Sequence, residues 1–224
     1  VFNQPNHEGA CVLPMSGGVG AQYTPVAGWA QAIEYHRKHL NNSDCDEAMG
    51  LVLGGDGSVA TNGFWSSLTL ATTLQLPMLF YIEDNGYGIS VPSSFQTPGG
   101  NIVKNLASFK GIELLNGDGT NPAEAAALIK QANDIIREQR RPVLLRLTVP
   151  RLNGHSAQDT QSYKSDDRIA FEKQHDPLPK LQQYLLAEGL MTATDWEALA
   201  AQAKEDVMSA YHRVDQEDFA DPEF

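Results

Sequence analysis

Cysteine is scarce in this chain, and long apolar runs are missing. The 224 residues include two cysteines, Cys11 and Cys45, which lie far apart and form no metal-type or disulfide-rich pattern. We therefore expect a reducing compartment such as the cytoplasm. No apolar run approaches the roughly 20 residues needed to span a bilayer, and no charged start leads into an apolar signal segment. The sequence thus predicts neither a membrane protein nor an exported one.

Positive charge is also in the minority. The chain has 16 basic and 28 acidic residues, which gives a net charge of −12. An acidic surface repels nucleic acid and anionic lipid, so we expect neither as a partner. The sequence opens at Val1, without methionine, in loop-like residues. We expect a fragment or a processed chain.

What is present is ordinary globular sequence, 42% apolar, in which helical and strand-like segments alternate. This alternation predicts an α/β fold, a mostly parallel sheet with helices on both faces. The expected core includes Trp29, Tyr35 and Phe64. The predicted elements are a helix at 24–39, a strand at 48–55, a helix at 64–74, strands at 78–83 and within 109–119, a helix at 122–140 and a strand at 142–149.

The character of the sequence changes at residue 176. Two helical segments follow, the second introduced by a capping box of Thr194 and Glu197. A capping box of Asn121 and Glu124 is likewise expected before the helix at 122–140. We predict two domains, 1–175 and a C-terminal helical extension at 176–224.

One carboxylate stands between glycines where a buried strand ends, in the sequence LVLGGDGSVATN at 51–62. Parallel strands joined by a right-handed crossover end at the same edge of a sheet, so Asp56 and Asn85 should lie side by side. Glycines on both sides of Asp56 allow unusual backbone angles and let a phosphate approach the main chain. A carboxylate beside a phosphate needs a hard cation between them, and Mg²⁺ takes carboxylate and amide oxygens. The sequence therefore predicts a magnesium–phosphate site.

Spacing strengthens this prediction. Residues 58 to 83, a stretch of 26, separate the Gly-Asp-Gly from the pair Asp84–Asn85, a length that suits a loop, a helix and a strand. A second Gly-Asp-Gly, around Asp118, provides a control, because Arg146 and Leu147 occupy the corresponding positions and offer no amide oxygen. We expect Asp118 to be a turn residue.

The same residues resemble a known family. Gly-Asp-Gly, 26 residues and an Asn pair or its variant resemble the thiamine diphosphate motif, and DNGYGIS is similar to the NNGYxIS of the alpha subunit of the first component of 2-oxo acid dehydrogenase complexes. The resemblance implies the thiamine diphosphate-binding fold for 1–175, N-terminally incomplete. It implies Mg²⁺ bound by Asp56, Asn85 and the Tyr87 carbonyl. The implied cofactor-binding residues are Gly55, Asp56, Gly57, Ser58, Asn85, Tyr87, Gly88, Ile89 and His155.

Further segments extend the resemblance over most of the chain. GAQYTPVAGWAQAI at 20–33 is similar to the family segment before the motif, and RLNGHSAQDTQSYK at 151–164 resembles its R-x-x-x-H-S loop. By resemblance His155 is catalytic in acyl transfer, and a neutral imidazole is suited to proton transfer. Arg151 is expected to brace this loop through Asp159. Ser156 and Ser162 stand where regulated relatives are phosphorylated, and the sequence leaves their modification open.

Three departures from the family pattern are visible. Asp84 replaces the first Asn of the pair, SVATNGFW replaces a stretch that often carries an acidic residue, and Glu83 stands where several members have an arginine that meets the diphosphate. The phosphate charge must then be met by Mg²⁺, by a segment before Val1 or by Arg151.

The resemblance implies oxidative decarboxylation of a 2-oxo acid, with acyl transfer to a lipoyl domain. Branched-chain substrates, as for 2-oxoisovalerate dehydrogenase in branched-chain amino acid catabolism, are favoured, and pyruvate or acetoin stays open. The glutamate that activates the cofactor lies, in the family, on a beta subunit or a fused pyrimidine-binding domain, so a heterotetramer in a multienzyme complex is expected and the chain alone should be inactive. In a eukaryote the compartment would be the mitochondrial matrix. The alternatives are another thiamine enzyme, such as a transketolase-like one, or a non-catalytic scaffold.

Overall fold

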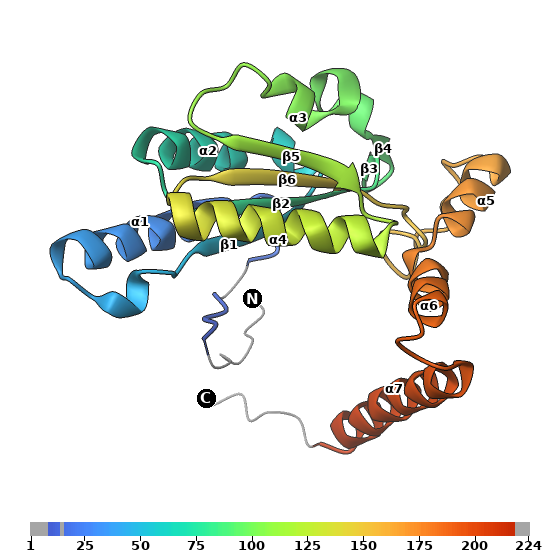
Figure 1. The fold of residues 1–224 in the computed structure, drawn as a ribbon. Helices are drawn as coiled ribbons and strands as arrows, with labels where there is room; N and C mark the ends of the chain where they lie inside the picture. The colour runs from blue at the N-terminus through green and yellow to red at the C-terminus, as the bar shows by residue number, and fades with distance from the viewer. Residues whose placement is uncertain (1–8, 14–15, 218–224) are drawn as a thin grey trace. The chain divides into compact units, whose positions relative to one another are not determined.

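Four parallel strands form the central sheet (Figure 1). The computed structural model describes residues 9–13 and 16–217; Val1 lies outside them. The strand order is β1-β2-β6-β5, and each neighbouring pair is parallel. The strands are β1 (Gly50–Gly55), β2 (Met78–Asp84), β5 (Glu113–Asp118) and β6 (Val143–Thr148). The predicted α/β fold with a parallel sheet is confirmed.

Helices cover both faces of this sheet. Successive side chains of β2 point to opposite faces of the sheet and belong to two separate hydrophobic clusters. On one face, Met78 and Phe80 pack with three helices, α1 (Tyr23–His39), α2 (Asn62–Leu74) and α3 (Ile102–Asn105). Leu79 packs on the opposite face with α4 (Pro122–Gln139), which lies across the sheet in Figure 1. A strand buried on both faces has the continuous apolar sequence seen in MLFYIE.

The buried side of α1 differs from the expected one. Phe64 is buried as predicted, but Trp29 is 50% and Tyr35 56% exposed. The buried residues of α1 are Tyr23, Ala27, Ala30 and Glu34. Small alanines allow the helix to approach the sheet closely, so the large aromatic residues on the neighbouring positions remain outside.

A carboxylate occupies the last core position of α1. Glu34 accepts from Arg37 and from Arg140, which follows α4, and pairs with Lys38 at 2.8 Å. Burial alone would raise the pKa of Glu34, but the hydrogen bonds from Arg37, Lys38 and Arg140 outweigh it and lower the pKa to about 2. The buried face of α1 is therefore not apolar along its whole length, because at Glu34 an ion-pair cluster takes the place of an apolar side chain.

Both expected capping boxes need correction. Asn121 caps α4, accepting from the Glu124 backbone N–H at 3.3 Å, but the Glu124 carboxylate accepts from Asp118 instead of returning to Asn121. The long C-terminal helix α7 (Ala193–Asp215) begins earlier than predicted, with a capping box of Thr192 and Asp195 in place of Thr194 and Glu197. Aspartate closes the box as well as glutamate does because its carboxylate reaches the Thr192 N–H at 3.0 Å.

The remaining elements were not all anticipated. The short hairpin of β3 (Tyr87–Gly88) and β4 (Val91–Pro92) and helix α5 (Asp166–Gln174) were not predicted, whereas α6 (Pro177–Ala187) was. Single-turn helices lie at η1 (Ser43–Cys45), η2 (Ser58–Ala60), η3 (Ser93–Phe95) and η4 (Pro98–Gly100). None of the helices in the described ranges combines the length and apolar character of a membrane span.

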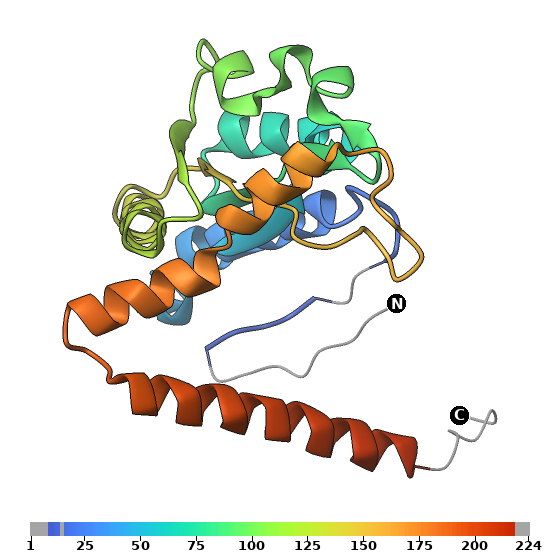
Figure 2. The ribbon, with the colours of Figure 1, turned by 90° about the vertical axis from the view of Figure 1, so that its right-hand side faces the viewer.

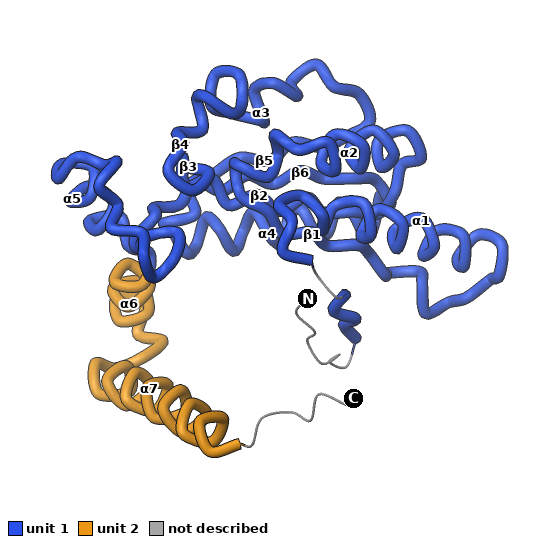
Figure 3. The backbone as a smooth tube through the Cα atoms, turned by 180° about the vertical axis from the view of Figure 1, so that it is seen from behind, with its two compact units in different colours: residues 1–177 blue, residues 178–224 orange. Residues whose placement is uncertain are grey.

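The chain divides into two compact units, Val1–Pro177 and Leu178–Phe224, coloured separately in Figure 3. The first contains the sheet and α1 to α5; the second contains most of α6 and all of α7. The two-domain organisation, 1–175 and 176–224, stays a prediction.

Candidate functional site

The carboxyl ends of β1 and β2 lie next to each other. Gly55, the last residue of β1, is paired with Glu83, so Asp56 and Asp84–Asn85 leave the sheet side by side. Figure 2 faces this carboxyl edge, where the segment between β6 and α5 passes in front of the sheet. The two loops therefore lie next to each other at the edge of the sheet where the sequence predicts them.

Asp56 is the central group of this edge. It is 4% exposed, and within the described residues both of its carboxylate oxygens are buried without a hydrogen-bond partner. Burial, and then the negative charge of Asp84, raise its pKa to about 6, against a lowering by the nearby Asn85 backbone N–H and by Arg151. The Asn85 N–H lies close enough to act on the carboxylate but makes no hydrogen bond with it, and Arg151 acts through its charge alone. A buried carboxylate without a partner is rare and suits a cation ligand.

The glycines around Asp56 have a different role from the one expected. Neither Gly55 nor Gly57 has a positive φ; that of Gly57 is −67°. A Cβ on Gly57 would lie 3.1 Å from the Cα of Gly88 and from Oε1 of Gln96. The expectation of unusual backbone angles is thus wrong. Glycine is favoured at position 57 because the loop there packs directly on Gly88.

Ser58 supports the turn from beneath. Its hydroxyl donates to the Gly55 carbonyl at 2.6 Å and lies 2.6 Å from the hydroxyl of Tyr23. Burial raises the pKa of Tyr23 to about 12, against a lowering by the Ser58 hydrogen bond. A Cβ on Gly54 would lie 2.1 Å from the Tyr23 hydroxyl, which accounts for that glycine. Tyr23 was not singled out from the sequence, because nothing in α1 distinguishes a core tyrosine from one under a loop.

The loop after β2 is a compact turn. Oδ1 of Asn85 accepts from the Tyr87 N–H and Oδ1 of Asp84 from the Gly86 N–H, both at 3.0 Å. Gly86 has φ 83°, and Ile89, which is 57% exposed, has φ 55°. A β-branched residue rarely adopts this left-handed conformation, and strained residues cluster at functional sites.

Asp84 pairs with a cation on the neighbouring strand. Arg146, on the neighbouring strand β6, donates through Nε to Oδ2 of Asp84 at 2.6 Å and through Nη1 to Asn116 at 2.7 Å. The negative charge of Asp84, the residue that replaces the first Asn of the family motif, is therefore balanced by Arg146. Arg146 drew attention in the sequence only because it offers no amide oxygen; its pairing with Asp84 depends on β6 lying beside β2.

The His155 loop lies against the turn after β2. Arg151 donates to the Ile89 carbonyl and lies 3.4 Å from Nδ1 of His155. Asp159 accepts from the His155 N–H at 2.7 Å and from the Tyr163 hydroxyl at 3.0 Å. Arg151 thus braces the loop through Tyr163, 3.5 Å away, and not by a direct ion pair with Asp159. His155 is exposed, as are Ser156 and Ser162.

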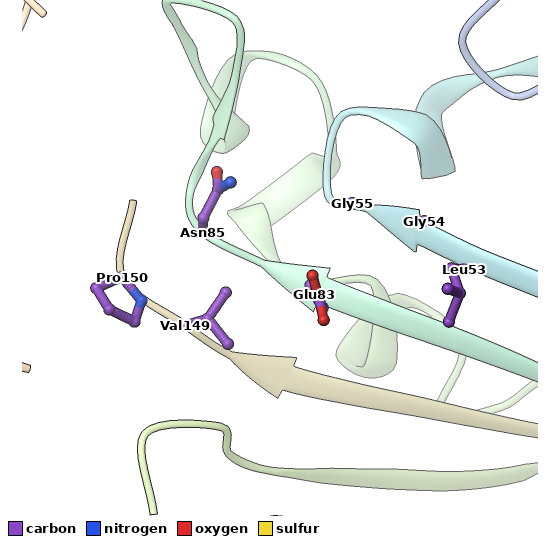
Figure 4. A pocket seen from close by; sticks show the side chains of 7 residues that line it. All are labelled: Leu53, Gly54, Gly55, Glu83, Asn85, Val149 and Pro150. Atoms are coloured by element: carbon purple, nitrogen blue, oxygen red, sulfur yellow. The ribbon is translucent and has the colours of Figure 1, made fainter. Parts of the chain in front are cut away.

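A hollow of about 400 Å³ opens beside Asn85 (Figure 4). Within the part of the chain that the structure describes, Glu83 is the one charged side chain among its lining residues. It stands on the same face as Leu53, since their positions in the β1–β2 register are two residues apart. The lining residues are Leu53, Gly54, Gly55, Glu83, Asn85, Val149 and Pro150.

The donor set near Asp56 limits which metal fits. Over residues 9–13 and 16–217, no three His, Cys, Asp or Glu side chains converge as a metal site would require. One buried carboxylate with an amide oxygen nearby is instead the sparse oxygen set that Mg²⁺ uses when it keeps waters and phosphate oxygens. Asp118, in the second Gly-Asp-Gly, accepts from Thr120 N–H at 2.8 Å as the predicted turn residue.

Comparison with known proteins shows the family of this chain. The profile of the family described as "Dehydrogenase E1 component" matches residues 3–223. The mouse 2-oxoisovalerate dehydrogenase subunit alpha, mitochondrial, is 29% identical over 72% of this chain and 37% of its own length. Pyruvate dehydrogenase E1 component subunits alpha are 29% identical in Rickettsia conorii (94% of this chain, 60% of the relative) and 26% in Staphylococcus aureus (88% and 51%).

The chain thus spans between 37% and 60% of the length of these relatives. The family profile nevertheless matches nearly all of this chain. The chain belongs to the dehydrogenase E1 component family, and the relatives it resembles are alpha subunits.

Proposed function

We propose that this chain supplies the diphosphate- and magnesium-binding half of a thiamine diphosphate-dependent site for oxidative decarboxylation of a 2-oxo acid. The observation that carries the proposal is the buried carboxylate of Asp56, without a hydrogen-bond partner among the described residues, beside Asn85 at the carboxyl edge of the sheet. Family membership supports the cofactor.

Three oxygens of this chain would hold Mg²⁺. Asp56 would give the charge, the Asn85 amide a neutral oxygen, and Tyr87 its backbone carbonyl. The Asn85 amide is already oriented, since its Oδ1 accepts from the Tyr87 N–H, and an oxygen has a second lone pair for a cation. The close packing of Gly57 on Gly88 keeps the two loops together. The raised pKa of Asp56 fits the role, because a cation would return the carboxylate to its charged form.

Bound thiamine diphosphate supplies a ring carbanion that adds to the 2-oxo group and an electron sink as CO₂ leaves. The protein binds and orients it. Gly55, Gly57, Ser58, Gly88 and Ile89 would form the cofactor-facing loops, with Ser58 acting through the Gly55 carbonyl that its hydroxyl supports.

The diphosphate charge is the difficult point. Glu83 lines the hollow and would repel a phosphate. Mg²⁺ would offset part of that repulsion, and Arg151 adds positive potential, since its charge already lowers the pKa of Asp56. We infer that affinity for the cofactor depends strongly on the metal.

His155 would act in the transfer of the acyl group to a lipoyl domain. Its imidazole is exposed at the same edge, and its backbone is fixed by Asp159. A histidine held by its main chain and open to solvent can meet a bulky carrier while exchanging a proton with the reacting group.

A partner must complete the site. The segment from Gly86 to Val103 has no charged residue, and it exposes Phe95 (82%), Ile89 (57%) and Val91 (44%) beside the candidate site. Such a surface is typical of an interface. We propose that it faces a pyrimidine-binding beta subunit or fused domain, giving a heterotetramer. Phe95→Asp should abolish association without changing the thermal midpoint; unchanged association would contradict this role.

The substrate class stays a proposal. Branched-chain 2-oxo acids are favoured, and pyruvate is the alternative, since relatives carry either name. A cytoplasmic location, or the matrix in a eukaryote, is proposed with it.

Calorimetric titration of thiamine diphosphate, with and without Mg²⁺, tests the function. Binding should require Mg²⁺ and be lost in Asp56→Asn and Asn85→Ala. Asp118→Asn is the matched control, because it alters the other Gly-Asp-Gly and should bind normally. Binding that is equal in Asp56→Asn would refute the metal site. Absence of binding even with the partner present would favour a scaffold that keeps the fold, an alternative that Glu83 in the hollow supports.

A further inference from the structure

A lysine and a glutamate are buried together next to the candidate site. The side chains of Lys164 and Glu172 are 0% and 2% exposed, and Nζ lies 2.6 Å from Oε2. Lysine is almost never buried to this extent unless it is paired. Neither residue has a role in the proposed chemistry, so their burial needs another explanation.

The three hydrogen bonds of the Lys164 ammonium join two segments. Nζ donates to the Arg151 carbonyl at 3.1 Å, to Oε1 of Gln161 at 2.8 Å and to Glu172 at 2.6 Å. The first two acceptors belong to the loop 151–164 and the third to α5. An ammonium has three donors, so all of them are used. Lys164 thus closes the base of the loop on the helix.

Lys164 and a neighbour of Glu172, Arg168, also contact Tyr87 in the turn after β2. Nζ of Lys164 lies 5.1 Å from the centre of the Tyr87 ring, and the guanidinium of Arg168 lies 5.8 Å from it. Arg168 in turn donates to Oε1 of Glu172 at 2.8 Å. Cations at this distance from an aromatic ring attract it. The cluster therefore joins α5, the loop and the residue whose carbonyl would face the metal.

We propose that Lys164 and Glu172 form a buried latch that positions the loop 151–164, and with it Arg151 and His155, against the turn at 85–89. Both are positioning residues, acting through Arg151 and Tyr87. The value of the latch to catalysis rests on the proposed function, whereas the latch itself is a property of this chain.

Energetics favour positioning over plain stability. Replacing a buried ion pair with apolar side chains of similar size is often neutral or stabilising, whereas removing one partner leaves a buried charge. If stability were the only role, an apolar pair would serve equally well. An apolar pair, however, offers no donors to the Arg151 carbonyl or to Gln161, so the fold would persist while the loop is released.

Amide hydrogen exchange on the cofactor-free chain tests the latch. The reporters are the N–H groups of His155, Asp159, Gln161 and Lys164, which are hydrogen-bonded within the loop. In Lys164→Met/Glu172→Leu they should exchange about tenfold faster or more, while amides of β6 change less than about twofold. Lys130→Met is the matched control, because it breaks an exposed lysine–aspartate pair. It should change neither set.

A second readout separates positioning from general loosening. Hydrogen bonds from the His155 and Gln161 N–H groups lower the pKa of Asp159. Release of the loop should move that pKa back up toward its ordinary value, as followed by carbon NMR of the carboxyl group. Glu172→Gln, which keeps the side-chain volume, should show the same effects more weakly and serves if the double variant does not fold.

Two results would overturn the latch. One is unchanged loop exchange and an unchanged Asp159 pKa in the double variant. The other is equal acceleration of the loop and of β6, which would make the pair a general stabiliser. Failure of thiamine diphosphate to bind would refute the proposed function and leave these measurements valid.

Discussion

Arg146 donates to the carboxylate of Asp84 at 2.6 Å with both side chains largely buried, 12% and 6% exposed. The pair keeps a negative charge next to Asp56 neutralised, although Asp84 still raises the pKa of Asp56. The substitution of Asp for Asn at this position is thus tolerated because a cation on the next strand balances it.

Arg146→Met should destabilise the protein by about 3 kcal/mol, because it leaves the Asp84 charge buried without its partner. Urea unfolding at pH 8 measures the loss. Arg146→Met/Asp84→Asn removes the stranded charge and should recover most of it. Equal losses in the single and the double variant would show that the packing of Arg146, and not its charge, is what matters.

Asp56→Asn should stabilise the metal-free chain at alkaline pH. The folded-state pKa is about 6, above the ordinary value of 3.8, so the folded state binds the proton more tightly. The contribution of Asp56 to the free energy of unfolding is therefore fully present below about pH 4, where the carboxyl group is protonated, and is lost as the pH rises through 6. The variant escapes that loss, a gain on the order of 2 kcal/mol at pH 8 and none at pH 4.

Unfolding in urea at both pH values, with chelator, checks this. Asp159→Asn is a control of opposite sign: the pKa of Asp159 is lowered by the His155 and Gln161 N–H groups. Its charged form therefore favours folding, and the variant should be destabilised at pH 8. A gain for Asp56→Asn that is the same at pH 4 and pH 8 would contradict the role of burial.

Ile89→Asn should stabilise the protein by about 1 kcal/mol, because asparagine tolerates the left-handed φ of 55° better than a β-branched residue. The thermal midpoint reports the change. Val91→Asn, on the same hairpin but without a positive φ, should give no gain. If both variants behave alike, the φ of Ile89 stores no strain.

Thr192→Ala should weaken the start of α7 by about 1 kcal/mol, since Thr192 accepts from the Asp195 N–H. Thr194→Ala, within the first turn, should have no unfavourable effect. Amide exchange along α7 distinguishes the two. If only Thr194→Ala weakened the start of α7, the N-cap would be Thr194 and not Thr192.

Local sequence patterns were sufficient for most of the fold. Apolar runs with proline or glycine at their ends predicted the strands β1, β2 and β6 and the helices α1, α2 and α4. The right-handed connection between the first two strands then predicted that Asp56 lies beside Asn85. The same patterns misjudged Trp29 and Tyr35, because size and apolarity do not show which side of a helix approaches a sheet.

Contacts between distant segments were the parts that the sequence could not reveal. The pairs Arg146–Asp84 and Glu34–Arg140 join residues 62 and 106 positions apart. Tyr23 beneath Ser58 and Lys164 against Tyr87 are of the same kind. Each depends on which strands and helices become neighbours, and charges at such positions resemble ordinary surface residues in the sequence.

The strand order also has a consequence during synthesis. Among the strands in the described residues, β6 is the last to leave the ribosome, yet it lies between β2 and β5. Until Thr148 has emerged, β1–β2 and β5 cannot join, and the inner edge of β2 stays open to other chains. At roughly 5–20 residues per second, translation from Asp84 to Thr148 leaves that edge open for several seconds, which is when a chaperone would be most useful to this protein.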